Sequence, residues 1–344
     1  MSSNQPKIKF INIFLKNRGF SPDHVAFDSL AGDGSQRTYH RVRNALSNKS
    51  FIIMENRPEN RLLQKENISY LRIGEHLAGK GLPVPEILSY DLNNGWFILE
   101  DMGDNHLNDD QTPQTDYGDI YQRVTETLFR LQTEGSNGFK TEWCYQTKYY
   151  DQSVMRKSEA DYFRDSFLIN YIGLKKENLS LDKTFDYLAE TASNAENSFF
   201  LHRDFQARNI MLNNGGIGII DWQGGRLGPL GYDLASLMIE AYKLTEDKKQ
   251  MVFDNYLQML KDYIPDTLDN FREYYPYLAI QRNLQILGAF SFLTKVQKKT
   301  QFKIYIGPAL RSLNRLLDEL ADPGLSLLKD IVSSIQIDET EKSK

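Results

Sequence analysis

Most of the first hundred residues form short runs that are either apolar throughout or alternate between apolar and polar side chains. Both patterns are typical of strands that bury one or both faces. They predict five strands, at residues 26–30, 38–43, 51–54, 87–90 and 96–99. Turn-forming residues at 32–35 and 93–95 join two pairs of these runs, so we expect two hairpins.

A helical period interrupts the strands between Leu62 and Gly79, where apolar side chains recur at spacings of three and four. Gly81 and Pro83 follow and mark the end of this helix. After a polar segment at residues 100–103, helical periods dominate. They occur at residues 117–132, 162–171, 234–242, 252–263 and 308–320.

This change of pattern predicts an α+β fold with two lobes and a short hinge. We expect an N-terminal antiparallel-sheet lobe with one helix at residues 1–103. A larger, mostly helical lobe follows at residues 104–337, and residues 338–344 form a polar, disordered tail. Ligand clefts often form at boundaries of this kind.

Composition narrows the class of protein. With 40% hydrophobic and 25% charged residues among 344, the chain is typical of a globular protein. It has no apolar run long enough for a membrane-spanning helix, and its first residues lack the apolar core of a secretory signal. A single cysteine, Cys144, and five histidines leave neither an internal disulfide nor a zinc site. The net charge of -5 argues against nucleic-acid binding. Taken together, these features lead us to expect a cytoplasmic monomer that binds neither nucleic acid nor membrane.

The chemically most informative stretch is His-Arg-Asp-Phe-Gln-Ala-Arg-Asn at residues 202–209, followed twelve residues later by Asp221. Phosphoryl transfer needs a carboxylate that orients the acceptor hydroxyl and takes its proton, a role that suits Asp204. Asn209 and Asp221 offer the hard oxygen ligands that Mg²⁺ prefers. Apolar runs at residues 210–212 and 217–220 predict a hairpin that returns Asp221 to the side of Asn209.

Neighbouring polar residues fit supporting roles. His202 is better interpreted as a buried orienting residue than as an acid or a base, and Asp233 as an anchor for the loop and for a helix start. Arg208 lies four residues after Asp204, where it can offset phosphate charge or form a surface salt bridge, and both interpretations stay open.

These motifs resemble a known family. Residues 202–209 are similar to the kinase catalytic loop, and Gly228-Pro229 with Asp233-Leu234-Ala235 resembles the aminoglycoside phosphotransferase (choline kinase-like) family. The resemblance runs from about residue 28 to residue 237. Within the family, residues 34–41 and 203–211 are most similar to bacterial anomeric kinases of cell-wall recycling, which phosphorylate N-acetylmuramate or N-acetylglucosamine at C1.

The resemblance implies a bilobal protein-kinase-like fold that uses ATP and Mg²⁺ and takes a sugar or amino sugar as its small-molecule acceptor. It implies that residues 1–103 form the nucleotide-binding lobe and residues 104–337 the catalytic and acceptor-binding lobe. The two lobes are then parts of one catalytic domain, because the proposed site needs both. Gly32, Gly34 and Ser35 can offer backbone N–H groups to phosphates, although the same residues also suit a simple turn. Backbone groups between Glu100 and Met102 would meet the adenine edge, although a plain linker explains these residues equally well.

One departure concerns the cation that binds the phosphates. Kinases of this fold usually carry a lysine on the third strand, paired with a glutamate on the helix, but residues 51–55 contain no lysine. Glu66 stands at the expected helix position without that partner. Either Arg37, Arg41 or Lys65 takes its place, or backbone and Mg²⁺ suffice, or the protein is a nucleotide-binding pseudokinase. Arg37 and Arg41 alternate along one strand, so both can face phosphates or both can face solvent.

The acceptor is the least determined feature. Aromatic residues before the catalytic loop suit either a carbohydrate platform or core packing, and they are Trp143, Tyr145, Tyr149, Tyr150 and Tyr162. An aromatic cage would favour choline. Four carboxylates in the same region keep a polycationic aminoglycoside open, and they are Asp151, Glu159, Asp161 and Asp165. No Ala-Pro-Glu follows Asp221, and there is no room for an activation loop, so a protein kinase is not expected.

Overall fold

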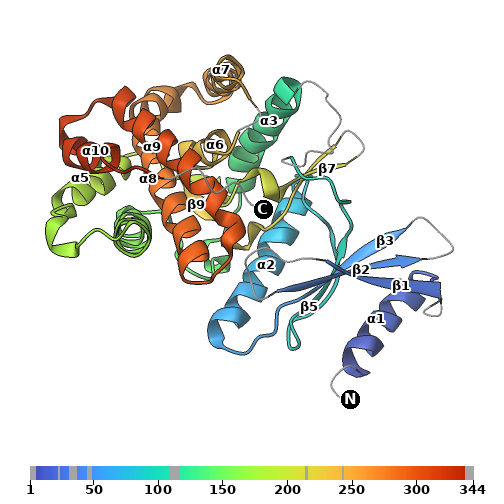
Figure 1. Cartoon of the computed structure of the whole chain (residues 1–344). Helices are drawn as coiled ribbons and strands as arrows, with labels where there is room; N and C mark the ends of the chain where they lie inside the picture. Colours follow the sequence, from blue (N-terminus) through green and yellow to red (C-terminus); the bar gives the residue numbers. More distant parts are fainter. Residues whose placement is uncertain are drawn as a thin grey trace. The chain divides into compact units, whose positions relative to one another are not determined.

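The computed structural model describes residues 5–21, 24–30, 37–44, 49–107, 117–213, 216–241 and 244–337, and every structural statement below refers to these (Figure 1). Within them, the predicted strands form one antiparallel sheet in the order β1-β2-β3-β5-β4. Its strands are β1 (Val25–Leu30), β2 (Thr38–Asn44), β3 (Ser50–Glu55), β4 (Ile87–Asp91) and β5 (Trp96–Glu100). Both predicted hairpins, β1–β2 and β4–β5, are confirmed as paired strands.

Two helices pack on this sheet, α1 (Gln5–Asn17) and α2 (Arg61–Gly79). In α1, Leu15 joins a buried cluster that contains Ile98 of β5. In α2, the Tyr70 ring meets the edge of Phe97, with ring centroids 5.3 Å apart. Because neighbouring residues on a strand point to opposite faces, the two helices cover opposite faces of the sheet. The sequence predicted α2 but not α1.

The β4–β5 turn requires a glycine at position 95. Gly95 has a φ of 68°, and a Cβ there would lie 1.9 Å from the carbonyl oxygen of Asn56. That close approach lets Asn56 N–H donate to the Gly95 carbonyl at 2.8 Å, which ties the turn to the end of β3.

Later in the chain, the structure has two further strand pairs. They are β7 (Ile210–Asn213) with β8 (Gly216–Ile219), and β6 (Phe199–Leu201) with β9 (Arg226–Gly228). The β7–β8 pair is antiparallel, with Ile210 opposite Ile219, and confirms the predicted hairpin.

The chain divides into two compact units, each built from several stretches of sequence. Unit 1 comprises Met1–Pro113, Gly138–Gln146 and Arg208–Gly225. Unit 2 comprises Gln114–Asn137, Thr147–Ala207 and Arg226–Lys344. The functional division into a nucleotide-binding part and a catalytic part after residue 103 stays a prediction.

Unit 2 is mostly helical. Its described α-helices are α3 (Tyr117–Ser136), α5 (Asp182–Ala192), α6 (Leu230–Ile239), α7 (Glu246–Tyr263), α8 (Leu268–Lys295), α9 (Ile306–Leu320) and α10 (Ser326–Ser333). A further helix has π-helical segments η3 (Val154–Ala160) and η4 (Arg164–Ile172) on either side of the α-helical residues α4 (Asp161–Phe163). Together with the sheet of unit 1, these helices confirm the predicted α+β fold class.

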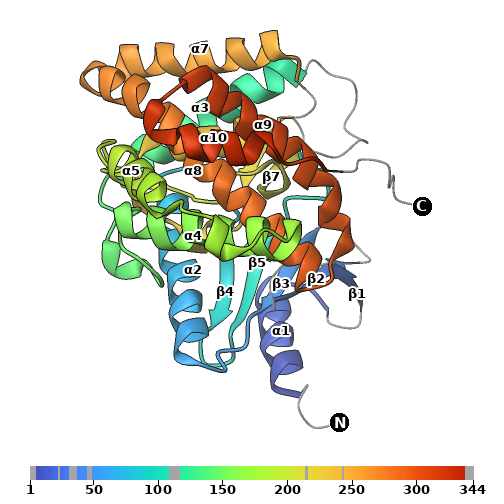
Figure 2. The same cartoon turned by 60° about the vertical axis from the view of Figure 1, so that its left-hand side comes forward.

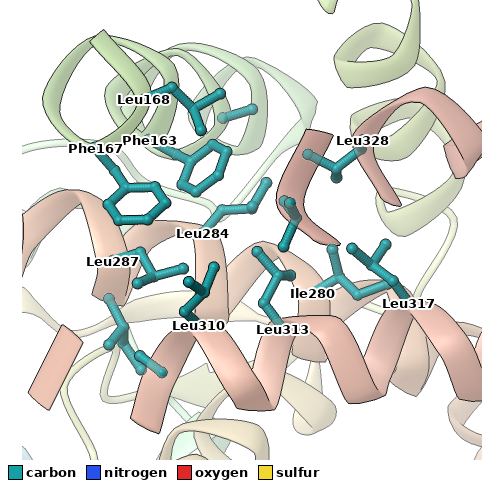
Figure 3. Packing of buried hydrophobic residues seen from close by; sticks show 14 of the residues in the cluster. Phe163, Phe167, Leu168, Ile280, Leu284, Leu287, Leu310, Leu313, Leu317 and Leu328 are labelled. Carbon is teal, nitrogen blue, oxygen red and sulfur yellow. The ribbon is translucent and has the colours of Figure 1, made fainter. Parts of the chain in front are cut away.

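The helix α8 forms the centre of unit 2, where it contacts α5, α6, α9 and the π-helical segments (Figure 2). Figure 3 shows Leu284 and Leu287 of α8 among Phe163, Phe167 and Leu313, all fully or almost fully buried. The helical periods predicted for α3, α6, α7 and α9 fall on those helices, whereas α8 was not predicted.

None of the described helices combines the length and the apolar character that crossing a membrane requires. The predicted disordered tail at residues 338–344 lies outside the described residues.

Candidate active site

The β7–β8 hairpin of unit 1 places the two candidate metal ligands side by side. Asn209 directly precedes β7, Asp221 follows β8 by two residues, and the Ile220 N–H donates to the Asn209 carbonyl at 3.0 Å. Asp221 has a φ of 69°, in the left-handed region that few residues other than glycine, asparagine and aspartate adopt. The backbone therefore turns sharply at the candidate metal ligand.

Helix α2 fixes the turn that follows Asp221. The buried Trp222 ring stacks on Tyr70 with centroids 4.7 Å apart, and its Nε1 donates to the Tyr70 carbonyl at 2.9 Å. Ser69 Oγ donates to the Gln223 carbonyl at 2.8 Å. A Cβ at Gly74 would lie 2.8 Å from the Trp222 ring, so the close approach needs glycine. These contacts hold the backbone at Asp221 in one position relative to α2.

Arg37, the residue directly before β2, bridges two carboxylates of unit 1. Its Nη1 donates to Asp221 Oδ1 at 2.8 Å, and its Nη2 donates to Glu66 Oε1. The Arg37 side chain is only 4% exposed. Burial acts to lower the pKa of the guanidinium, but Asp221 and other neighbours, Glu66 among them, outweigh it and raise that pKa. We call Arg37, Glu66 and Asp221 the Arg37 cluster.

Arg41 lies on β2, four residues after Arg37, and has different partners. Its Nε lies 2.7 Å from Asp101 Oδ2, and Nη2 donates to the Gly103 carbonyl at 2.8 Å, while Nη1 donates to Asp104. Burial acts to raise the pKa of Asp101, but hydrogen bonds from Ser50 and Arg41 outweigh it and lower that pKa. Arg41 thus ties the segment after β5 to the sheet, and Glu66 pairs with Arg37.

In unit 2, Asp233 anchors the chain that leads to Asp204. Asp233 lies in the first turn of α6, and its carboxylate accepts hydrogen bonds from the N–H groups of His202 at 2.7 Å and Arg203 at 2.9 Å. Burial raises the pKa of Asp233 to about 7, although these two hydrogen bonds and Arg282 act to lower it. Arg203 has a φ of 77°, so the backbone just before Asp204 also adopts the left-handed region.

The Asp204 side chain contacts a buried arginine from α8. Nη1 and Nη2 of Arg282 each lie 3.5 Å from Asp204 Oδ1. The Arg282 side chain is 0% exposed, whereas that of Asp204 is 42% exposed. Close by, the hydroxyls of Tyr150 and Tyr232 donate to the buried Glu159, and burial raises the pKa of that carboxyl to about 7.

Comparison with known proteins shows the family of the chain. A model of the phosphotransferase enzyme family (APH) matches residues 27–274. The chain belongs to this family. The resemblance stated from the sequence is therefore confirmed, as is the predicted enzyme class, a phosphotransferase with an alcohol group as acceptor.

Two curated relatives are named N-acetylmuramate/N-acetylglucosamine kinase. The protein of Pseudomonas aeruginosa is 25% identical over 313 residues, which cover 89% of this chain and 87% of that protein. The protein of Neisseria meningitidis is 24% identical over 322 residues, which cover 90% of this chain and 91% of that protein.

Solved structures of the same type show the fold. A choline kinase from Cryptosporidium parvum has a TM-score of 0.64 and 14% identity, covering 95% of this chain and 99% of that one. A Plasmodium vivax ethanolamine kinase has a TM-score of 0.60 and 12% identity, covering 88% and 86%. At these identities the likeness concerns the fold alone, and it confirms the kinase-like fold that the motifs implied.

The structure distributes the predicted site residues of this phosphotransferase between the two units. Asn209 and Asp221 belong to unit 1 and Asp204 to unit 2, and the chain passes from one unit to the other between Ala207 and Arg208. The roles assigned to these three residues stay predictions.

The structure describes only some of the predicted nucleotide-binding residues. Gly32, Gly34 and Ser35 lie outside the described residues. The Glu100 N–H already donates to the Glu86 carbonyl at 2.9 Å, so an adenine contact at this residue would fall to its carbonyl. A Cβ at Gly218 would lie 3.1 Å from Met102 Sδ, which places Met102 beside β8.

Arg208 is positioned through its main chain. The Nδ1 atom of His106 donates to the Arg208 carbonyl at 2.7 Å, and the neighbouring Leu107 N–H donates to Ile210 at 2.9 Å. A phosphate or substrate contact by the Arg208 side chain stays a prediction.

The oxygen atoms of Asn209 and Asp221 fit a magnesium ion. Among the described residues, no three histidine, cysteine, aspartate or glutamate side chains gather in a way that could hold a metal by themselves. Mg²⁺ commonly binds through one or two protein oxygens and completes its shell with substrate phosphates and water. An amide oxygen and a carboxylate beside one hairpin match that donor set.

Sequence reasoning missed Arg282. It named Glu159 and Tyr150 as candidates for the acceptor region but did not predict that they and Tyr232 form one buried group, which we call the Glu159 cluster. A usable signal existed, because Gln281, Arg282 and Asn283 interrupt an otherwise apolar stretch and all three are fully buried. A charged residue is rarely buried completely unless it has a partner.

Proposed function

We propose that this protein is an ATP- and Mg²⁺-dependent kinase that phosphorylates an N-acetylated amino sugar. The acceptor is the anomeric hydroxyl of N-acetylmuramate or N-acetylglucosamine. The observation that carries the phosphoryl-transfer chemistry is the Arg37 cluster, in which a buried arginine joins the helix glutamate Glu66 to the candidate metal ligand Asp221. The sugar acceptor is supported by the names of the curated relatives, whose matches cover about nine-tenths of the chain.

In this proposal each residue has one task. Arg37 faces the nucleotide phosphates and takes the part that a third-strand lysine plays in other kinases of this fold. Asn209 and Asp221 would hold Mg²⁺, which when bound neutralises charge on the phosphates. Asp204 orients the acceptor hydroxyl and receives its proton.

The carboxylates that kept an aminoglycoside acceptor open have protein partners. Asp151 accepts from the Val154 N–H at 2.9 Å, and Glu159 accepts from two tyrosine hydroxyls. Asp161 pairs with Arg156 and Arg164, and Asp165 pairs with Arg164 at 2.9 Å. A polycation would have to compete with these arginines, so an uncharged or anionic sugar is the better match.

Two of the aromatic residues considered for the acceptor have packing partners of their own. Tyr150 is buried in a core cluster of unit 2, and its hydroxyl bonds to Glu159. Trp143 packs in unit 1 against the rings of His76 and Phe139, with centroids 5.2 and 5.5 Å away. This disfavours an aromatic choline cage that includes either of them.

The pseudokinase interpretation loses its motivation for a similar reason. It rested on the missing third-strand lysine, which would leave Glu66 without a cation. Arg37, directly before β2, supplies that cation. Because Asp204, Asn209 and Asp221 are all present as well, we favour an active enzyme.

The test is a panel of acceptors with Mg-ATP, read by ATP consumption and by mass spectrometry, with phosphorus NMR to identify the phosphorylated oxygen. We expect N-acetylmuramate or N-acetylglucosamine to respond and to give a 1-phosphate, and aminoglycosides and choline to stay silent. Asp204→Asn should lower kcat by about 10²–10⁴-fold, whereas Asp318→Asn, an exposed aspartate of α9 paired with Lys329, should keep full turnover. Turnover of choline or an aminoglycoside alone, or a fully active Asp204→Asn protein, would refute the proposal.

A further inference from the structure

The guanidinium of Arg282 lies in the interior of unit 2, where a positive charge is costly. Its side chain is fully buried on α8. Nε donates to Ser236 Oγ at 3.1 Å, and Nη1 donates to Gln285 Oε1 at 2.7 Å. Removing a charge from water costs free energy that neutral hydrogen-bond partners offset only in part. A balancing carboxylate is therefore needed.

The carboxylate that touches Arg282 directly is Asp204. Both terminal nitrogens lie 3.5 Å from the same oxygen, Oδ1, so the planar fork faces that side of the aspartate. The Asp204 side chain is 42% exposed, so the group that is held from the interior is still open to small molecules. The buried Arg282 cation is fixed in place, so its contact with the accessible Asp204 carboxylate holds that carboxylate in one orientation.

Further ionisable groups interact with the pair or with its neighbours. Tyr232 lies between Arg282 and Glu159, since its hydroxyl donates to Glu159 and lies 3.4 Å from Arg282 Nη1. The guanidinium carbon also lies 5.4 Å from the centre of the Tyr232 ring. Asp233 and Glu240 of the α6 region and Arg203 complete the electrostatic surroundings. Arg282 is thus held by α6, α8 and the Glu159 cluster, and it contacts the loop of Asp204.

We propose that Arg282 is a positioning residue that holds the Asp204 carboxylate in the orientation needed to receive the proton of the acceptor hydroxyl. This rests on the proposed function, in which Asp204 is the base. In that step the hydroxyl proton moves to Asp204, and the hydroxyl oxygen forms a bond to the γ-phosphorus. The bond from that phosphorus to the bridging oxygen breaks, and ADP leaves with the electron pair. Arg282 touches neither reacting atom.

The test compares Arg282→Met and Arg282→Lys by steady-state kinetics. Loss of the fork should lower kcat by on the order of 100-fold in Arg282→Met, because small displacements of a reacting group carry penalties of that size. Arg282→Lys keeps the cation without the planar fork and should lose only about 10-fold. The KM for ATP should stay within about twofold of the wild-type value in both variants.

Arg156→Met is a matched control. Arg156 also lies in unit 2, and its guanidinium pairs with Asp161, Asp182 and Asp186. Its loss should lower the melting temperature without changing kcat. If Arg282→Met does not fold, Arg282→Lys carries the test, because the lysine retains the buried charge.

The deciding measurement is a double-mutant cycle with Asp204→Asn. If Arg282 acts through Asp204, Arg282→Met should have no further effect on kcat once the base is removed. An equal fold-loss in both backgrounds would overturn the proposal, as would a folded Arg282→Met protein with wild-type kcat.

The outcome is separable from the acceptor question. If another alcohol proves to be the substrate, the proposed sugar specificity fails, but the Arg282 variants are then measured with that alcohol. A protein that phosphorylates no acceptor at all would overturn both proposals.

Discussion

Two buried arginines, one in each unit, stand beside candidate catalytic carboxylates, and they are held in different ways. Arg37 forms direct ion pairs with two carboxylates, those of Glu66 and Asp221. Arg282 contacts one carboxylate, Asp204, at 3.5 Å and reaches Glu159 only through the Tyr232 hydroxyl.

The difference concerns how each arginine is neutralised. The Arg37 cluster contains two counter-charges in direct contact with the guanidinium. Around Arg282, burial raises the pKa of Glu159 and of Asp233 to about 7, so the charge balance there changes with protonation. One unit thus holds an ion-pair cluster, and the other holds an arginine whose surroundings titrate.

The strongest test of this division is a pair of substitutions in the carboxylates that the arginines touch. Asp204→Asn should lower kcat by about 10²–10⁴-fold, the usual range for a lost general base, with Mg-ATP affinity unchanged. Asp221→Asn should instead weaken Mg-ATP binding. Steady-state kinetics and calorimetric titration with Mg-ATP distinguish the two. Identical profiles for both variants would contradict separate roles.

The next largest effect is expected from Arg37→Met. The variant leaves Glu66 and Asp221 facing each other without a cation, so kcat/KM for ATP should fall about 100-fold, which corresponds to about 2.7 kcal/mol. The free energy of unfolding should fall by about 2 kcal/mol, less than for a fully buried pair because Asp221 is partly exposed. Urea titration and ATP kinetics measure both.

Arg43→Met serves as the control for Arg37→Met. Arg43 lies on β2, the strand that follows Arg37, and pairs with Asp28, but its side chain is 56% exposed. An exposed pair contributes little, so this variant should change neither quantity measurably. Equal losses in the two variants would mean that the cluster has no special role.

A smaller effect should appear in the pH dependence of stability. In the native protein Glu159 and Asp233 keep their protons up to about pH 7, whereas their ordinary values are 4.5 and 3.8. The unfolded chain therefore binds fewer protons between about pH 5 and pH 7, and stability should fall as the pH rises through that window. We expect a loss of about 1–3 kcal/mol between pH 5.5 and pH 8 in urea titrations.

Glu159→Gln separates this effect from the remaining charges. The amide oxygen can accept from one of the two tyrosine hydroxyls and the amide NH2 can donate to the other, and the amide does not titrate. The variant should lose part of the pH slope, and Asp233 should retain the rest. A slope equal to that of the wild type would show that Glu159 is already ionised at neutral pH.

The smallest predicted effect concerns one hydrogen bond of unit 1, near the candidate metal ligand Asp221. Ser69→Ala removes the hydrogen bond to the Gln223 carbonyl in the turn after Asp221. We expect a loss of about 1 kcal/mol in the free energy of unfolding and a modest rise in the KM for Mg-ATP. The kcat of the variant should be unchanged, since Asp204 belongs to unit 2. A selective fall in kcat would show that the turn affects the base.

Local patterns predicted much of the fold. The strands β1 to β5, the helix α2 and the β7–β8 hairpin follow from short-range alternation and turn residues. The helix α8 could not be predicted in this way. Its segment from Leu278 to Gly288 is buried on nearly all faces, so apolar and polar positions do not separate into two faces. A proline at position 276 inside the helix further obscures the pattern.

Prediction of the site met the same limit. The motif at residues 202–209 and Asp221 could be recognised because their spacing is local. The pairing of Arg37 with Glu66 joins residues 29 positions apart, and that of Arg282 with Asp204 joins residues 78 positions apart. Charge and spacing along the chain left Arg37, Arg41 and Lys65 as equal candidates for Glu66. Only the folded chain, which brings Arg37 into contact with Glu66 of α2, decides among them.

The division of unit 1 has a consequence for the newly made chain. Its first stretch ends at Pro113 and its last ends at Gly225, 112 residues later. At about 5–20 residues per second, roughly 6–22 s of synthesis separate the two. During that interval the nascent sheet has Tyr70 without Trp222 and Arg37 without Asp221. Translation speed over this stretch therefore sets how long an incomplete unit 1 is exposed to chaperones and proteases.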